Sequence, residues 1–385
     1  MKNFYLTNVV AAVEGKEIPA HIAVENGVIT AVDLEQNHGK NLPEIDGCGN
    51  LLLPGFLDLH THGAANVDVN AADEEGLRTI GRFFASQGVS GWLCSILTDT
   101  KEQTLKAIAA ARAVIESEYD GAPLLGIHLE GPCLAKEYKG AMPEHLLMHQ
   151  GDASLFALYQ EAAGGYIKYV TLSPEIPGAI DIIPELRKLG IVVAMGHSGA
   201  GYDTSWAAVN AGVTAATHLG NAERLFHQHD PAIWGVALES DCYVEAICDG
   251  LHLHPGSVRL YLKAKGLDRV VAVTDSIMAS GLPDGFYKLG VNDVVVEKGD
   301  AKLVSNGTRA GSTLTLIRAL KNITAWTGYP VAEAVRMMTK TPASLMGWEK
   351  KGQIAPGMDA DLVLIDREWN VLRTFAVGRQ VYTAV

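Results

Sequence analysis

The sequence has no run of about 18 apolar residues, so no segment is long enough to cross a membrane as a helix. Its first residues, 1–4, lack the apolar core of a secretion signal. The five cysteines are scattered without a C-x-x-C pair, and several lie in apolar runs, as buried thiols of a reducing compartment do. These absences predict a cytoplasmic protein with no membrane partner.

Positive charge is also in short supply. The chain has 31 Lys and Arg against 44 Asp and Glu, which gives a formal net charge of −13. This balance argues against nucleic acid or an acidic membrane surface as a partner, although it leaves room for a local basic pocket. Hydrophobic residues make up 48% of the 385 positions and charged residues 19%, a composition typical of a globular protein with a large core.

No G-x-G-x-x-G follows the first apolar run, which disfavours an open, doubly wound dinucleotide-binding sheet, the second choice of fold. Apolar strand-like runs instead alternate with helical runs, as expected of a parallel sheet. The predicted strands are 53–59, 92–97, 124–129, 166–172, 191–195, 213–217, 244–248 and 270–274. Eight is the number that closes a (β/α)8 barrel, so we predict this α/β fold.

The two chain ends differ from the middle, because both are rich in short strands and turn signals, including Asn26-Gly27 and Pro356-Gly357. We expect residues 1–52 and 351–385 to pair into one small β-sandwich module. The catalytic barrel is then predicted at 53–350.

Polar residues follow several of the predicted barrel strands. His60 and His62 come after the first strand, and imidazole is a frequent ligand of zinc-type sites. The other candidates each end a later strand: Glu130, His197, His218 and Asp275. The carboxyl ends of barrel strands open on one face, so these side chains should converge. Nitrogen and oxygen ligands without thiolate suit zinc, iron, manganese or cobalt as a divalent metal, and the sequence does not choose among them.

Asp275 has a second interpretation. A carboxylate beside a divalent cation has a lowered pKa and can accept a proton from water that the cation activates. The alternatives are that Asp275 is one more ligand, or the N-cap of a helix, since Ser276 follows it.

Six segments together resemble the amidohydrolase superfamily, and most closely its N-acetylglucosamine-6-phosphate deacetylase family. They are P-G-F-L-D-L-H-T-H-G at 54–63, H-L-E-G-P at 128–132, G-H-S at 196–198, T-H-L-x-N-A at 217–222, D-G-L-H at 249–252 and V-T-D at 273–275. The similarity runs nearly end to end, and includes A-G-S-T-L-T at 310–315 and the segment 352–363.

The resemblance implies hydrolysis of the acetamide of an N-acetyl amino sugar, most simply N-acetylglucosamine 6-phosphate. Glu130, His197 and His218 match the principal metal ligands. His60 and His62 match the pair that holds a second ion, which Glu130 would bridge, giving one or two ions per subunit. Asp275 matches the catalytic acid and base, and His252 matches a residue that polarises the acetamide carbonyl. The substrate contacts that the resemblance implies are Ala141, Asn221, Ala222, Asp249, Arg309, Ala310 and Gly311, together with Met142, which stands where some members carry a polar residue or histidine.

The match weakens on the sugar-phosphate side. His229 stands where the family usually has an arginine that binds phosphate, often in the neighbouring subunit of a homodimer. Arginine holds phosphate with a fork of donors that histidine lacks. Gly220 and Glu223 replace a common aromatic residue and methionine, and Glu223 adds negative charge. Arg224 either compensates or is an ordinary surface arginine.

Several substrates therefore stay open: an N-acetylhexosamine 6-phosphate of either stereochemistry, or an unphosphorylated sugar. Another small N-acyl compound or a cyclic amide would suit a different amidohydrolase. A sugar sensor without activity is a more distant alternative, because Asp275 and all the ligands are retained.

Overall fold

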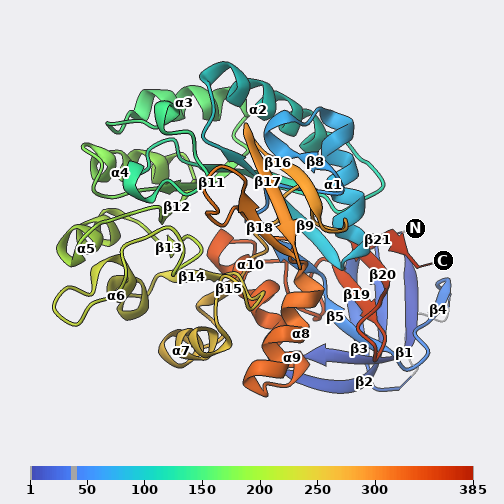
Figure 1. Cartoon of the computed structure of the whole chain (residues 1–385). Coiled ribbons are helices and arrows are strands. Elements are labelled where there is room, and N and C mark those ends of the chain that lie inside the picture. The colour runs from blue at the N-terminus through green and yellow to red at the C-terminus, as the bar shows by residue number, and fades with distance from the viewer. Residues whose placement is uncertain (1, 36–40, 385) are drawn as a thin grey trace.

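The computed structural model describes residues 2–35 and 41–384. Helices surround a central barrel of strands, and the strands of the two chain ends lie together beside it (Figure 1). No helix in the described ranges is both long and apolar enough to cross a bilayer.

The central sheet has eight parallel strands in the order β6-β9-β10-β11-β12-β13-β14-β15. Their bounds are β6 Phe56–Asp58, β9 Val89–Leu97, β10 Leu124–Glu130, β11 Ile167–Leu172, β12 Val192–Met195, β13 Ala215–Ala216, β14 Tyr243–Ala246 and β15 Val270–Ala272. Every predicted barrel run overlaps one of them, and all nine residues of β9 are buried, as the continuous apolar runs predict.

The barrel closes through residues that lie just beyond β6 and β15. Thr61 and Ser276 form a parallel bridge, and the amide of His62 donates to the carbonyl of Ser276 at 2.7 Å. The amide of Asp275 donates to the carbonyl of His60 at 2.9 Å. The (β/α)8 prediction is confirmed, and closure joins the first and last predicted site segments directly.

Helices cover the outside of the barrel. They are α1 Glu74–Ser86, α2 Lys101–Ile115, α3 Ala153–Ala162, α4 Ala179–Lys188, α5 Tyr202–Ala211, α6 Ala232–Glu239, α7 Pro255–Lys265, α8 Leu316–Thr327, α9 Val331–Ala334 and α10 Lys340–Met346. In α1, Asp73 caps the first turn by accepting the amide of Gly76 at 2.8 Å. Leu77, Ile80 and Phe84 then lie on one buried face of this helix, toward the core.

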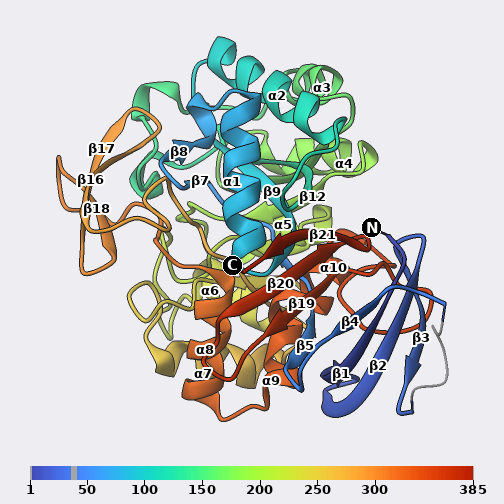
Figure 2. The same cartoon turned by 90° about the vertical axis from the view of Figure 1, so that its right-hand side faces the viewer.

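Both chain ends contribute to a second, mixed sheet in the order β21-β20-β19-β5-β1-β2-β3, with β4 paired to β1 (Figure 2). Its strands are β1 Phe4–Val13, β2 Lys16–Glu25, β3 Val28–Asp33, β4 Glu44–Asp46, β5 Leu51–Pro54, β19 Leu362–Ile365, β20 Val371–Ala376 and β21 Arg379–Thr383. The predicted pairing of the two ends is confirmed. The division at residues 52 and 351 stays a prediction.

The apolar run predicted as one strand at 53–59 is in fact two. Leu51–Pro54 belongs to the terminal sheet and Phe56–Asp58 to the barrel, with Gly55 between them. A Cβ at Gly55 would lie 2.4 Å from the Ser90 hydroxyl, so only glycine fits where the chain passes from one sheet to the other.

A three-stranded antiparallel sheet was not predicted. It consists of β16 Gly285–Leu289, β17 Asn292–Glu297 and β18 Asp300–Leu303, and it projects from the barrel (Figure 2). Val294 and Leu289 pack in a separate apolar cluster with Met142 and Leu134. This sheet therefore supports loops that follow β10 and β15.

Replacing Phe375 by Ala should test how far the terminal sheet stabilises the protein. Phe375 in β20 stacks on Phe4 in β1 at a ring-centroid distance of 4.8 Å, and both side chains are buried. We expect Phe375→Ala to lower the free energy of unfolding by about 3–5 kcal/mol, measured by chemical denaturation. Phe286→Ala is the matched control, because Phe286 is 80% exposed, and a change within about 0.5 kcal/mol is expected there. Equal effects of the two substitutions would contradict the prediction.

Candidate active site

Four imidazoles and one carboxylate meet at the carboxyl ends of the barrel strands. Glu130 Oε1 lies 3.0 Å from Nε2 of His197 and 3.1 Å from Nε2 of His218. Glu130 Oε2 lies 3.3 Å from Nε2 of His62, and Oε1 lies 3.4 Å from Nε2 of His60. All five side chains are buried. The structure therefore brings together all five residues that the sequence predicts as ligands, with Glu130 in contact with every imidazole.

The ring orientations fit a cation. Nδ1 of His62 faces the carbonyl of Ser95 at 3.0 Å, and Nδ1 of His197 faces the carbonyl of Tyr138 at 2.8 Å. A carbonyl only accepts, so these Nδ1 atoms carry hydrogen, and Nε2 is the atom of each ring that faces the cluster and can bind an ion. The Nε2 atoms approach one another in pairs, His60 with His62 and His197 with His218, each at 3.1 Å. An ion between the members of a pair would be bound by both Nε2 atoms.

The carboxylates of the cluster are held in their ionised form. Burial raises the pKa of Glu130, but the neighbouring His60 and His197 outweigh burial and hold that pKa well below its ordinary value. Burial likewise raises the pKa of Asp275, and contacts with His62 and His60 reverse the shift and lower it. Ionised oxygen donors together with imidazole suit a borderline or hard divalent ion.

Asp275 lies at the edge of the cluster, with Oδ1 3.2 Å from Nε2 of His62 and 3.7 Å from Nε2 of His60. Three atoms contributed by Asp275, His60 and His62 are close enough together to hold an ion, so the ligand alternative stays open. The N-cap alternative is wrong, because residue 276 forms bridges with Thr61 and Ser312 and no helix begins there.

Backbone conformation is unusual at three of these residues. His197, His218 and Asp275 have φ of 48°, 29° and 50°, in the left-handed region that non-glycine residues rarely adopt. Each of them lies two or three residues beyond the end of a barrel strand, and such conformations cluster at functional sites. The turn lets the side chain leave the strand direction and enter the cluster.

A cleft of about 390 Å³ opens onto the cluster. Of the predicted site residues, its wall includes His62, Glu130, Ala141, Met142, His197, His218, Asn221, Ala222, His252, Asp275, Arg309, Ala310 and Gly311. Gly311 has a φ of 60°, and a Cβ there would lie 2.9 Å from the carbonyl of Asp275, so this loop needs glycine to pass so close.

Glu223 lines the same cleft and differs from expectation. Its Oε1 accepts the amide of Gly220 at 2.8 Å, whereas Oε2 is buried and has no partner. Burial raises the pKa of Glu223 to about 8, so the carboxyl is mostly protonated at neutral pH. The negative charge expected here is therefore largely absent.

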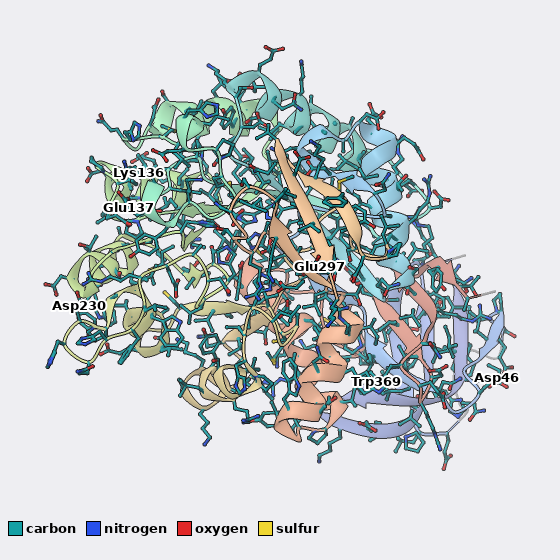
Figure 3. All side chains as sticks on the ribbon, in the orientation of Figure 1. Asp46, Lys136, Glu137, Asp230, Glu297 and Trp369 are labelled. Atoms are coloured by element: carbon teal, nitrogen blue, oxygen red, sulfur yellow. The ribbon has the colours of Figure 1, made fainter. Side chains whose placement is uncertain are left out.

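Three predicted contact residues lie outside the cleft wall. Asp249 instead supports His252, with Oδ2 2.7 Å from its Nδ1. Arg224 pairs with Asp230 at 2.8 Å. His229 and Asp230 line a separate hollow of about 710 Å³, and Asp230 lies at the edge of the molecule (Figure 3). A contact of His229 or Arg224 with substrate stays a prediction.

The sequence profile of the amidohydrolase family matches residues 51–381. The chain belongs to the amidohydrolase family. It is 33% identical over 366 residues to the N-acetylglucosamine-6-phosphate deacetylase of Lysinibacillus sphaericus, covering 95% of this chain and 94% of the relative. It is also 33% identical to an N-acetylgalactosamine-6-phosphate deacetylase of Escherichia coli O157:H7, covering 93% of both chains.

Comparison with solved structures agrees with the sequence relatives. A mutant N-acetyl-D-glucosamine-6-phosphate deacetylase of Mycobacterium smegmatis, in complex with N-acetyl-D-glucosamine-6-phosphate, superposes on the chain with a TM-score of 0.90. The two are 30% identical, and 100% of both chains is covered. These findings confirm the resemblance that the motifs indicate. This amidohydrolase is a metal-dependent hydrolase that acts on an amide C–N bond.

One buried residue of this amidohydrolase site was missed by the sequence analysis. Glu245 in β14 has Oε2 3.0 Å from Nδ1 of His60, and the same oxygen accepts the amide of His218 at 3.1 Å. A signal existed in the sequence, because Glu245 is the one charged residue of the otherwise apolar strand β14. His128 in β10 was also passed over; it links the Ser95 and Thr171 hydroxyls at 2.8 and 2.9 Å beneath the ligands.

Proposed function

We propose that the protein removes the acetyl group from an N-acetylated amino sugar, with N-acetylglucosamine 6-phosphate as the first substrate, giving the amino sugar and acetate. The observation that carries the proposal is the convergence of five buried ligand side chains with Asp275 and His252 on one cleft. The names and coverage of the relatives support the same reaction.

His60, His62, Glu130, His197 and His218 would hold one or two divalent ions, zinc first. A bound ion supplies a Lewis acid that polarises the amide carbonyl and makes water acidic enough to act at neutral pH. The protein's part is to fix the ligands: Glu130 is ionised and touches all four imidazoles, and backbone carbonyls orient His62 and His197.

Asp275 is the proton carrier in this proposal. It is ionised and lines the cleft beside His62, so its free carboxylate oxygen can take the proton of the attacking water. The same proton is then delivered to the nitrogen as the C–N bond breaks, so that the amine leaves neutral. Water and amide become acetic acid and amine, which ionise to acetate and ammonium at neutral pH, with no other reactant.

His252 polarises the carbonyl of the acetamide. Its Nδ1 donates to Asp249, whose pKa stays low because the contact with His252 outweighs burial. The Asp249 carboxylate thereby orients the ring, and an Nε2 hydrogen on it would bind the carbonyl oxygen as negative charge develops there. Asp249 acts by orienting His252 and need not touch the sugar.

One observation favours unphosphorylated N-acetyl amino sugars as a second candidate. Among the described residues that line the cleft, Arg309 is the one lysine or arginine, and its guanidinium already binds both oxygens of Asp300, at 2.7 and 3.0 Å. Phosphate recognition usually relies on a free fork of this kind. The cleft of a single chain thus offers little positive charge with which to bind a 6-phosphate.

A substrate panel tests both candidates. We expect acetate release from N-acetylglucosamine 6-phosphate, and we expect the phosphate to improve kcat/KM by less than about tenfold over the free sugar. Tenfold equals about 1.4 kcal/mol, less than the roughly 1.5–3 kcal/mol of one hydrogen bond to a charged group. N-acetylgalactosamine and its 6-phosphate complete the panel. No acetate from any of the four by the metal-loaded protein would refute the deacetylase proposal, and a preference of a thousandfold for phosphate would refute the second candidate alone.

We also propose a cytoplasmic homodimer. The five cysteines are free thiols, four of them buried, which suits a reducing compartment. Leu225 and Phe226 are 77% and 49% exposed beside the cleft, in the segment where the family's phosphate arginine would lie. Such exposed apolar side chains are typical of an interface. Light scattering should give twice the 41.1 kDa of one chain.

A further inference from the structure

Glu245 is an unusual residue for its position. It lies in the interior of β14, is 0% exposed, and does not line the cleft. Removing a carboxylate from water is costly unless hydrogen bonds and nearby positive charge compensate. One oxygen, Oε2, has two such partners, His60 Nδ1 and the His218 amide, whereas no lysine or arginine contact is found for Glu245 in the described ranges.

The contact with Glu245 determines how His60 faces the cluster. A carboxylate accepts, so Nδ1 of His60 carries hydrogen and Nε2 presents its lone pair. That lone pair points among His62 Nε2 at 3.1 Å, Glu130 Oε1 at 3.4 Å and Asp275 Oδ1 at 3.7 Å. A carboxylate behind a ligating imidazole also makes the ring a stronger donor to a metal.

The other three imidazoles differ in this respect. Nδ1 of His62 and of His197 each donate to a neutral backbone carbonyl. Nδ1 of His218 is buried and has no partner among the described residues. Within this cluster His60 is therefore the one ligand backed by a full negative charge. The negative charge behind the ligands is therefore unevenly placed, and it favours ion binding by the His60–His62 pair.

We propose that Glu245 is a positioning residue that strengthens ion binding by the His60–His62 pair and so enables the site to hold a second divalent ion. This inference rests on the proposed metal-binding role of the cluster. Two divalent ions bring four positive charges, against which Glu130 and Asp275 supply two negative ones. The charge of Glu245 offsets part of the remainder, and an ion nearby would in turn account for a carboxylate buried at this place.

Glu245→Gln is the sharpest test, because glutamine keeps the size and an acceptor oxygen for His60 and His218 but removes the charge. Metal-free protein would be titrated with Zn²⁺ alone, by calorimetry and by elemental analysis after dialysis. We expect two ions in the wild type. In the variant we expect one ion bound as before and a 10–100-fold loss of affinity for the other, as is usual for a lost outer partner of a ligand. Glu297→Gln, at an exposed residue that ends β17 (Figure 3), should bind both ions normally.

A second variant shows whether Glu245 acts through His60. His60→Gln should bind a single ion, and adding Glu245→Gln to it should cause no further loss, because coupled residues are not additive. Circular dichroism of the metal-free proteins checks that each is folded. Should Glu245→Gln fail to fold alone, Glu245→Asp replaces it, and this shorter carboxylate is expected to weaken the second ion only.

Three results would overturn the inference. The first is unchanged affinity for both ions in Glu245→Gln, and the second is an equal loss of affinity for both ions. The third is that Glu245→Gln lowers the affinity by the same factor whether or not His60 is present. The inference and the proposed function fail separately. Two tightly bound ions without acetate release from any sugar would refute the function, whereas normal turnover with unaltered zinc binding in Glu245→Gln would refute only the inference.

Discussion

Replacing Asp275 by Asn is expected to lower kcat for acetate release by about 10²–10⁴-fold, the usual contribution of a general acid–base group. Asparagine has the same shape and keeps one side-chain oxygen, but it cannot take the proton of water or return one to the leaving amine. Because Asp275 touches the cluster at its edge, the ions held by Glu130 and the imidazoles should remain. Steady-state kinetics and elemental analysis of the same preparation measure both quantities.

The metal content decides between the two interpretations of Asp275. Loss of an ion together with activity would place Asp275 among the ligands, with His60 and His62. Near-normal kcat would remove Asp275 from the reaction altogether. Asp46→Asn is the matched control, because Asp46 is an exposed residue of β4 in the terminal sheet (Figure 3) and does not line the cleft, and it should change neither quantity.

The barrel and the ligand cluster were predictable because both follow from local sequence pattern plus one topological rule. Apolar runs give the strands, and a polar residue directly after each run lies at the carboxyl face of the barrel. Glu130, His197, His218 and Asp275 satisfy this rule although they are 145 positions apart from first to last. Strand length was less predictable: β13 spans only Ala215–Ala216, since the chain turns sharply at His218.

Residues that contact the ligands from within the barrel, such as Glu245, could not be predicted from the ends of the apolar runs. Glu245 precedes the end of its strand, and its partner His60 is 185 positions away. Only the closed barrel brings them together, so no spacing in the sequence encodes the contact. The pKa of Glu223 has the same origin, because a sequence shows the charge of a carboxyl group but not its burial.

The sheet of β16–β18 and the position of His229 were unpredictable for another reason. Both belong to loops, whose paths depend on the surfaces they cover rather than on a repeated pattern. Met142, for instance, packs with Val294 and Leu289 of that sheet, so its place in the cleft wall depends on an insertion about 150 residues later in the chain. Gly140 and Gly311 are among the local hints that these loops bend tightly, with φ of 55° and 60°.

Glu130→Gln should have an effect as large as that of Asp275→Asn, for a different reason. Glu130 is the one side chain that contacts all four imidazoles, from 3.0 to 3.4 Å. Glutamine removes the negative charge and directs an amide group, a donor, toward the lone pairs that would hold an ion. We expect weaker binding of every ion and a loss of activity of more than about a hundredfold. This loss exceeds the 10–100-fold that is typical when a residue behind a metal ligand is replaced.

Thermal unfolding separates this effect from simple misfolding. The amide of glutamine can donate to bare Nε2 atoms, so the metal-free variant should unfold near the temperature of the metal-free wild type. Saturating zinc should raise the unfolding temperature of the wild type, because ligand binding stabilises the folded state, and should raise that of the variant much less. Glu297→Gln should respond to zinc as the wild type does. An equal zinc-induced shift in Glu130→Gln would mean that the ions bind without Glu130, which would contradict the central place of this carboxylate in the cluster.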